Sequence, residues 1–343
     1  MNSFSIGVDL GGTNLRIAAY TRASGLLETI LLPTRLAAGR HAVVEDICSG
    51  VRKLLHTYSS QHYLAGIGIG TPGPLELPVG RLHSPPNLPG WDGFGLREEV
   101  ESSLGMPVTV ESDANVAALA ECILGSGRTL GLSSLCMLTL GTGIGNGIIL
   151  NGKIWHGVNG MAGEAGHVTI EPDGPACGCG SNGCLEMYAS ATAVRRIALD
   201  AAESGKAPAI AALAKRNPDF TTRDLSDLAE QGDPDAKRIF DGVGRALGIG
   251  IADLVNTLNL PLYVVGGGLA NAWDLFSPAL FAEVRHRSYV YRLTEPGRSV
   301  LNGGATNGTR IMSAELGADS GLLGACILPY TLNREKQGSA LSS

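Results

Sequence analysis

Two segments far apart in the chain share one pattern of apolar residues and glycine. Residues 6–18 have the sequence IGVDLGGTNLRIA, and residues 136–150 have the sequence CMLTLGTGIGNGIIL. Each segment predicts an apolar strand, a turn that begins with Leu-Gly, and a second apolar strand. A unit that occurs twice predicts two similar halves of one fold. Two ordinary hairpins with glycine turns would show the same pattern, so the repeat alone assigns no function.

The rest of the chain alternates between predicted strands and helices, which indicates an α/β fold. The expected strands are 5–9, 15–20, 64–69, 108–110, 135–140, 147–150 and 262–265. The expected helices are 43–58, 114–124, 191–204, 208–214, 235–256 and 271–287. We expect two α/β domains, residues 1–119 and 120–313, followed by a helix at 314–327. The last residues, 330–343, are polar, and we expect them to form a frayed tail.

Composition excludes several classes of protein. With 44% hydrophobic and 17% charged residues, the 343-residue chain is typical of a globular protein. Its net charge is −6 and it has no dense run of lysine or arginine, so nucleic acid is not an expected partner. The start, MNSFSIGVDL, lacks a signal-peptide pattern, and no apolar run reaches the ~20 residues that span a bilayer. We therefore expect a cytoplasmic protein with no membrane partner.

Three glycine clusters, each after a predicted strand, have the composition of loops that bind the phosphates of ATP. Glycine lets backbone N–H groups approach phosphate oxygens, and a threonine hydroxyl can add a contact. Asp9 stands at the end of its strand, where a carboxylate can hold Mg²⁺ through water. No lysine follows the glycines, so this is not a Walker A loop. The expected nucleotide-binding residues are Asp9, Gly11, Gly12, Thr13, Asn14, Gly141, Thr142, Gly143, Gly266, Gly267 and Gly268.

Asp113 lies between a predicted strand and a predicted helix. A carboxylate at such a corner can project into a cleft, and the N-terminus of the helix favours its ionised form. That environment is suitable for a general base that accepts the proton of a substrate hydroxyl during phosphoryl transfer. On the local sequence alone, a simple helix cap is the more common role for an aspartate in this position.

His167, Cys177, Cys179 and Cys184 have the spacing of a Cys₃His metal site. Three thiols interleaved with glycine can wrap one ion, and a histidine ten residues upstream completes a tetrahedron suited to Zn²⁺. A redox pair or a chance cluster is the alternative, but a CxC pair is geometrically awkward as a disulfide, and the cytosol is reducing. The other histidines are isolated, and we expect surface or packing roles for them: His41, His56, His62, His83, His156 and His286.

The motifs DLGGTN, LGTGIGNG and VVGGGL, in this order, resemble the ATP-binding segments of the actin-like kinase superfamily. Together with GEAGH and CGCGSNGCLE, they make the chain similar to the bacterial ROK family (repressors, open reading frames, kinases), and to its glucokinases in particular, from Ile6 to Ile327. The resemblance implies a duplicated actin-like ATPase (ribonuclease H-like) fold, with two domains and a central cleft. It also implies a structural Zn²⁺, a homodimer or tetramer, and a final helix that packs on the first domain.

The same resemblance implies an ATP-dependent kinase that phosphorylates the 6-hydroxyl of a hexose, most readily glucose, with Asp113 as the catalytic base. The matching sugar-binding positions are Asn87, Ser112, Asp113, Glu164, His167 and Glu186. Ser112 departs from the family pattern, which commonly has asparagine there. This departure leaves the sugar open among glucose, N-acetylglucosamine, N-acetylmannosamine, mannose, fructose and allose. Polyphosphate or ADP also stays open as the phosphoryl donor.

An alternative of another class is a sugar-sensing ROK repressor, which keeps the zinc and sugar elements of the family. Such repressors carry a helix-turn-helix of several dozen residues ahead of the kinase-like region. The first glycine loop of this chain begins at Asp9, so we do not expect that DNA-binding element. The negative net charge of the chain also favours an enzyme over a DNA-binding repressor.

Overall fold

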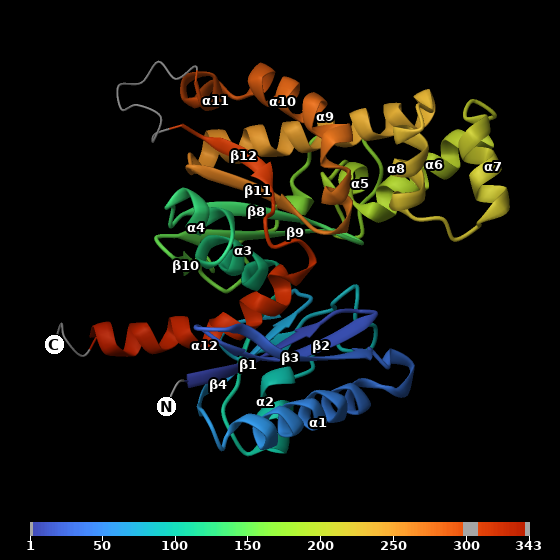
Figure 1. The fold of residues 1–343 in the computed structure, drawn as a ribbon. Helices are drawn as coiled ribbons and strands as arrows, with labels where there is room; N and C mark the ends of the chain where they lie inside the picture. The colour runs from blue at the N-terminus through green and yellow to red at the C-terminus, as the bar shows by residue number, and fades with distance from the viewer. Residues whose placement is uncertain (1–2, 298–307, 340–343) are drawn as a thin grey trace. The chain divides into compact units, whose positions relative to one another are not determined.

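The computed structural model describes residues 3–297 and 308–339 and divides them into two compact units (Figure 1). The first unit comprises Met1–Ser133, Gly147–Gly163 and Ala318–Ser343, and the second comprises Ser134–Asn146 and Glu164–Gly317. These ranges differ from the predicted 1–119 and 120–313, because the chain passes between the units more than once. Within the described residues, no helix is both long and apolar enough to cross a membrane.

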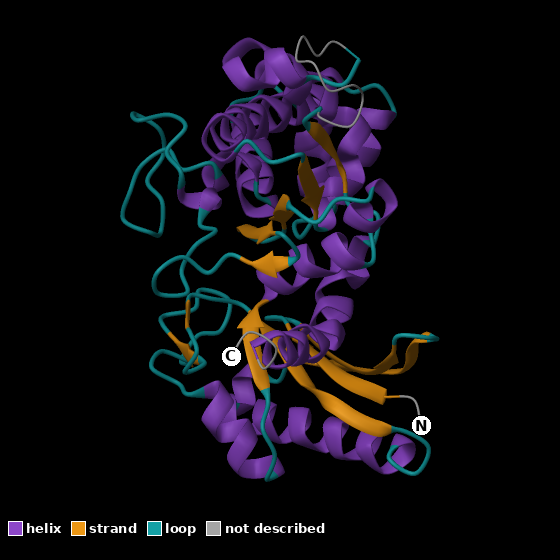
Figure 2. Cartoon of the chain, turned by 90° about the vertical axis from the view of Figure 1, so that its left-hand side faces the viewer, coloured by secondary structure: helices purple, strands orange, loops and turns teal. Residues whose placement is uncertain are grey.

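The first unit is built on a five-stranded sheet whose strands β1, β2 and β3 form an antiparallel meander, while β1, β4 and β7 run parallel. The order across the sheet is β3 (Gly25–Pro33), β2 (Asn14–Thr21), β1 (Ser3–Leu10), β4 (Tyr63–Thr71) and β7 (Thr109–Ser112). Helices α1 (Arg40–Tyr58) and α2 (Leu96–Leu104) cover one face (Figure 1 and Figure 2). The other face carries α3 (Asp113–Ile123) and α12 (Ser320–Ser339), which pack on each other.

Glycine allows α12 to approach the sheet and α3 closely. Gly68 of β4 faces the backbone of Ala325, and Gly324 of α12 faces the carbonyl of Val116, at distances that leave no room for a Cβ at either glycine. Helix α12 packs on α3 and on the sheet of the first unit, and it begins at Ser320 rather than at the expected residue 314. Where a polar tail was expected after residue 329, helix α12 continues through Pro329 to Ser339. Residues 340–343 lie outside the described part.

The second five-stranded sheet repeats the strand order of the first. Its order is β10 (Lys153–Ile154), β9 (Ile144–Leu150), β8 (Leu135–Leu140), β11 (Leu262–Gly266) and β12 (Arg310–Ser313). If the five strands of each sheet are numbered in chain order, both sheets have the spatial order third, second, first, fourth, fifth. Thus β1–β2 and β8–β9, the two strand–glycine turn–strand segments, occupy equivalent places. The predicted duplication is confirmed.

Most predicted elements exist, and the missed ones are short or half-exposed. The long helices of the second unit are α6 (Ala191–Glu203), α7 (Pro208–Arg216), α9 (Pro234–Leu258) and α10 (Trp273–Arg287), close to the predicted ranges. The prediction missed β3, α2, β12 and α8 (Thr222–Glu230). In the described part of the chain, the other short elements are β5 (Leu75–Glu76), β6 (Arg81–Leu82), α4 (Ser126–Leu130), α5 (Glu186–Ala189), α11 (Tyr289–Thr294) and the 3₁₀ turns Leu36–Ala38, Ala165–His167, Gly268–Ala272 and Gly317–Asp319.

Candidate functional site

Asp113 lies at the corner that the sequence predicted. Strand β7 ends at Ser112 and α3 begins at Asp113, so the carboxyl is in the first turn, near the positive end of the helix dipole. Asp113 Oδ1 accepts a hydrogen bond of 2.7 Å from the N–H of Ala114. The residue in the N-cap position is Ser112, whose side chain makes no capping hydrogen bond. Asp113 is therefore a partly buried acid in the first turn of α3 rather than its N-cap residue.

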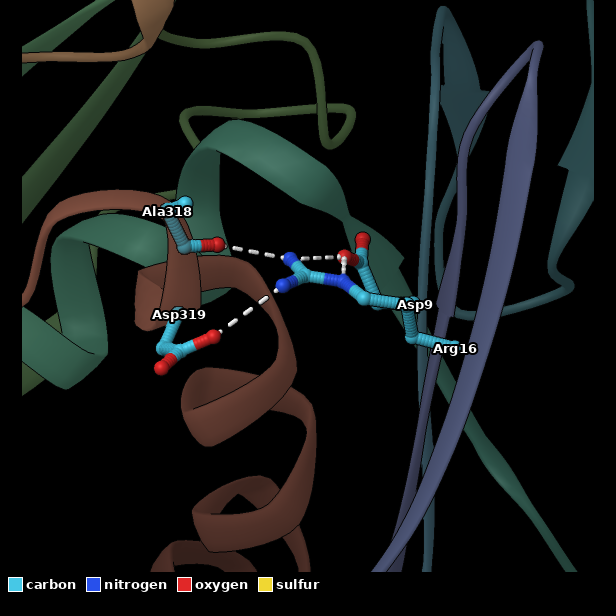
Figure 3. A network of polar contacts seen from close by, with 4 residues as sticks. All are labelled: Asp9, Arg16, Ala318 and Asp319. Atoms are coloured by element: carbon cyan, nitrogen blue, oxygen red, sulfur yellow. Dashed lines mark hydrogen bonds and ion pairs between the residues drawn. The ribbon is translucent and has the colours of Figure 1, made fainter. Parts of the chain in front are cut away.

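Asp9 is held by an arginine that the sequence analysis did not single out. Arg16 donates from Nε (2.9 Å) and Nη2 (2.6 Å) to Asp9 Oδ2, as Figure 3 shows. The same guanidinium also donates to the carbonyl of Ala318 (2.7 Å) and to Asp319 Oδ1 (3.2 Å), just before α12. The β1–β2 register places Asp9 opposite Arg16, so the symmetric spacing of the two residues about the glycine turn could have revealed the pair.

The first glycine loop contacts the loop that carries Asn87. A Cβ on Gly12 would lie 2.9 Å from the carbonyl oxygen of Asn87, which is closer than side chains tolerate. Thr34 Oγ1 donates to the carbonyl of Gly11 at 2.7 Å and fixes the other side of the turn. Thr13 and Asn14, at the tip, are exposed, as is Asn87. The structure therefore brings the predicted phosphate loop and one predicted sugar-binding residue together.

In the second unit, two glycine loops lie against each other. Gly267 has a φ of +85°, and a Cβ there would lie 2.5 Å from the carbonyl oxygen of Leu140, the last residue of β8. Gly141 follows Leu140 directly, so the loops 141–143 and 266–268 meet at the ends of adjacent strands. The third loop leads into a 3₁₀ turn, Gly268–Ala272, before α10 begins.

This packing predicts different costs for two neighbouring glycines. Gly267→Ala is expected to lower the free energy of unfolding by about 2 kcal/mol or more, because it adds a left-handed backbone penalty to a collision with β8. Gly268→Ala is the matched control, since its Cβ would meet no atom within 4 Å and its φ is not positive. Chemical denaturation of the two variants measures the difference. Equal stabilities would contradict the packing of this loop on β8.

Glu186 connects the metal-site segment to the second glycine loop. Its Oε2 accepts a hydrogen bond of 2.7 Å from the N–H of Ile144, and the same carboxylate fills the space that a side chain at Gly143 would need. The carbonyls of that loop face the start of α6, where Thr192 Oγ1 donates to Thr142 O at 2.7 Å. Sequence reasoning had assigned Glu186 to a sugar and had missed its contact with the loop.

Glu164 lies close enough to His167 and to Glu186 for their charges to affect its carboxyl. Partial burial raises the pKa of Glu164, the nearby carboxylate of Glu186 raises it further, and His167 opposes the rise. The side chains of Glu164, Glu186 and His167 therefore form a polar cluster at the 3₁₀ turn Ala165–His167. Carboxyl and imidazole groups in such an arrangement can accept and donate hydrogen bonds to the hydroxyls of a sugar.

The four predicted metal ligands are gathered in one place. The ligand atoms of His167, Cys177, Cys179 and Cys184 all lie within 4.8 Å of one another. Cys177 Sγ lies 3.6 Å from His167 Nδ1, and Cys179 Sγ lies 3.6 Å from Cys184 Sγ. Ligands at the Zn–S and Zn–N bond lengths of a tetrahedral site would be separated by about 3.5–3.8 Å. Two of the ligand pairs have this separation, so the cluster is close to the arrangement of a tetrahedral metal site.

The predicted residues form two groups, one on each unit. Asp9, the first glycine loop, Asn87, Ser112 and Asp113 belong to the first unit. The other two glycine loops, both glutamates and the Cys₃His cluster belong to the second.

Comparison with known proteins defines the family. A profile of the ROK family matches residues 5–331, so the chain belongs to the ROK family. A protein named glucokinase from Halalkalibacterium halodurans is 36% identical over 321 residues, 93% of this chain and 92% of that protein. A ROK family glucokinase from Streptomyces griseus, solved in complex with glucose and AMPPNP, has a TM-score of 0.75 at 31% identity, covering 95% of this chain and 99% of that chain. A putative xylose repressor from Caldicellulosiruptor sp. is 29% identical over 83% of this chain and 71% of its own length.

Proposed function

We infer that this chain is an ATP-dependent hexose kinase that phosphorylates the 6-hydroxyl of glucose. The observation that carries this inference is a carboxylate, Asp113, at a strand-to-helix corner in a ROK family member similar to glucokinases over most of its length. The relative solved with glucose and AMPPNP supports the sugar and the nucleotide as the two substrates.

In the proposed reaction, Asp113 accepts the proton of the 6-hydroxyl as that oxygen bonds to the γ-phosphorus and ADP leaves. A base positioned within hydrogen-bond reach accelerates such a step by about 10²- to 10⁴-fold. Ser112 precedes the base, and its shorter side chain reaches less far toward a sugar hydroxyl than asparagine would. Asn87, Glu164, His167 and Glu186 are the other proposed sugar ligands, and specificity among hexoses depends on which hydroxyls they pair.

The glycine loops are the proposed phosphate-binding elements, with Asp9 as the residue that holds Mg²⁺. When bound, Mg²⁺ neutralises charge on the transferred phosphate. Arg16 donates two hydrogen bonds to Oδ2 of Asp9, and the carboxylate would hold Mg²⁺ if the metal binds there. Arg16 thus holds the Asp9 carboxylate in one orientation before the metal arrives.

We propose that His167, Cys177, Cys179 and Cys184 hold a structural Zn²⁺ that shapes the sugar site. Nδ1 of His167 faces Cys177, so Nε2 is the nitrogen left for a sugar hydroxyl. The cytoplasmic location and the homodimer or tetramer that the family resemblance implies are proposals too, as are polyphosphate and ADP as further donors.

A hexose panel tests the proposed function. With ATP and Mg²⁺, we expect glucose to give the highest kcat/KM, ahead of mannose, fructose, allose, N-acetylglucosamine and N-acetylmannosamine. A coupled assay for ADP measures turnover, and nuclear magnetic resonance of the product locates the phosphate. Preference for another hexose would correct the substrate, whereas no turnover with any of them, together with sugar-dependent DNA binding in a gel shift, would favour the repressor class instead.

A further inference from the structure

Glu111 is a buried carboxylate directly before the two corner residues. It is 4% exposed, and its Oε1 accepts hydrogen bonds from the N–H of Ser112 (2.8 Å) and from Asn115 Nδ2 (2.9 Å). Its Oε2 lies 2.7 Å from His156 Nε2. An ionised carboxylate only accepts, so the imidazole donates to it. A buried carboxylate is tolerated only when partners replace its lost hydration, and these three groups are such partners.

His156 reaches Glu111 from a distant part of the chain. It follows β10, which packs against α3, and its side chain is 40% exposed. The backbone around it is itself anchored, because Trp155 N–H donates to Ile148 O at 2.8 Å and Ala162 N–H donates to His156 O at 3.2 Å. The imidazole therefore joins an anchored turn to the corner between β7 and α3. The expectation that His156 is an isolated surface or packing residue is wrong.

The contacts of Glu111 fix both sides of Asp113. On one side, Oε1 holds the N–H of Ser112, which sets the orientation of the peptide bond between Glu111 and Ser112, just ahead of the base. On the other side, the same oxygen holds Asn115 in the first turn of α3. A displacement of about 1 Å in a reacting group can cost about 10²-fold in rate. The position of Asp113 is sensitive to whatever moves this corner.

We infer that Glu111 and His156 are positioning residues for Asp113: the buried carboxylate orients the corner, and the imidazole holds that carboxylate in place. This inference rests on the proposed function, because it needs Asp113 to act as the base. It assigns neither Glu111 nor His156 a contact with a substrate. Its consequence is that losing the imidazole impairs turnover and leaves the binding of glucose and ATP nearly unchanged.

The first experiment compares kcat with binding in full-length variants. His156→Ala is expected to lower kcat for glucose by about 10- to 100-fold, with the glucose Kd, measured by calorimetry without ATP, changed by less than about threefold. His156→Gln, whose amide can donate to Glu111 Oε2, is expected to recover most of the loss. His41→Ala is the matched control, since His41 also lies near a glutamate of the first unit (Nδ1 to Glu99 Oε2, 3.9 Å) but is exposed and far from α3 in sequence.

The second experiment combines His156→Ala with Asp113→Asn. If His156 acts through Asp113, the double variant has the same residual kcat as Asp113→Asn alone, because His156 cannot improve the position of a base that is absent. The inference is overturned if the losses in kcat multiply in the double variant, or if His156→Ala keeps the wild-type kcat. In either case the proposed function still stands as long as the wild-type chain phosphorylates glucose. A lower melting temperature with an unchanged kcat per folded molecule would assign His156 a purely structural role. A wild-type chain that phosphorylates no hexose would overturn both.

Discussion

Replacing Asp113 with asparagine is expected to lower kcat for glucose phosphorylation by about 10²- to 10⁴-fold, the usual contribution of a general base. Asparagine keeps the size and planarity of the side chain but cannot take the proton of the 6-hydroxyl. Asparagine keeps an oxygen that can accept the hydrogen bond from the N–H of Ala114, and Glu111 still holds Ser112 and Asn115. We therefore expect the glucose Kd to stay within a few fold of the wild-type value, as measured by calorimetry.

The control variant should also remove a negative charge from the first turn of a helix. Asp274→Asn removes an exposed aspartate from the first turn of α10, just as Asp113→Asn removes one from the first turn of α3. Loss of such a charge costs a helix about 0.3–1 kcal/mol, so both variants should show a similar small change in stability. Only the variant at Asp113 should lose turnover. A near-normal kcat in Asp113→Asn would remove the residue from the reaction and leave it as a first-turn acid that stabilises α3.

The sequence was sufficient for those parts of the fold and site that depend on neighbouring residues. The two strand–glycine turn–strand segments predicted the duplicated sheets because apolar strands and glycine turns are local signals. The corner at Asp113 was predictable for the same reason, since a strand end and a helix start meet within a few residues. The Cys₃His cluster needed only spacing, and its ligands lie together.

Pairs that depend on register or on distant segments were not predictable in this way. Glu111 and His156 are brought together by the packing of β10 on α3, which no local pattern encodes. Strand β3 was missed because none of its residues is fully buried, so it lacks a clear apolar face. Helix α8 is different, because a signal existed: Thr221 and Asp224 form a capping box, and Asp224 Oδ2 accepts from the N–H of Thr221 at 2.7 Å.

Removing one thiol of the Cys₃His cluster is expected to release zinc and destabilise the second unit. Cys179 is the sharpest choice because it is exposed, whereas Cys184 is fully buried. An exposed side chain without a special role changes stability by about 0.5 kcal/mol or less. If Cys179 is a zinc ligand, Cys179→Ala should instead cost about 2 kcal/mol or more, since metal binding contributes directly to folding. The melting temperature should fall by about 5 °C or more, and zinc measured by mass spectrometry should fall from about one atom per chain toward zero.

Cys122→Ala supplies the contrast. Cys122 is buried in α3 and lies outside the cluster, and burial raises the pKa of its thiol to about 11. This variant should lose a little stability and keep its zinc. In the cluster itself, a hydrogen bond from the N–H of Ser181 lowers the pKa of Cys179, which favours the thiolate that a metal needs. A native protein that contains no zinc, or a Cys179→Ala variant as stable as the wild type, would contradict the metal site.

The kinetic pattern of Cys179→Ala should differ from that of Asp113→Asn. His167 is one of the proposed zinc ligands, and Glu164 lies near both His167 and Glu186, so loss of zinc should disorder the proposed sugar ligands of the second unit and raise the KM for glucose. Asp113 lies on the first unit and is not part of the cluster, so kcat at saturating glucose should fall much less than in Asp113→Asn. A chelator applied to the wild type should reproduce the rise in KM, and added Zn²⁺ should reverse it. Equal losses of kcat in the two variants would mean that zinc does more than shape the sugar site.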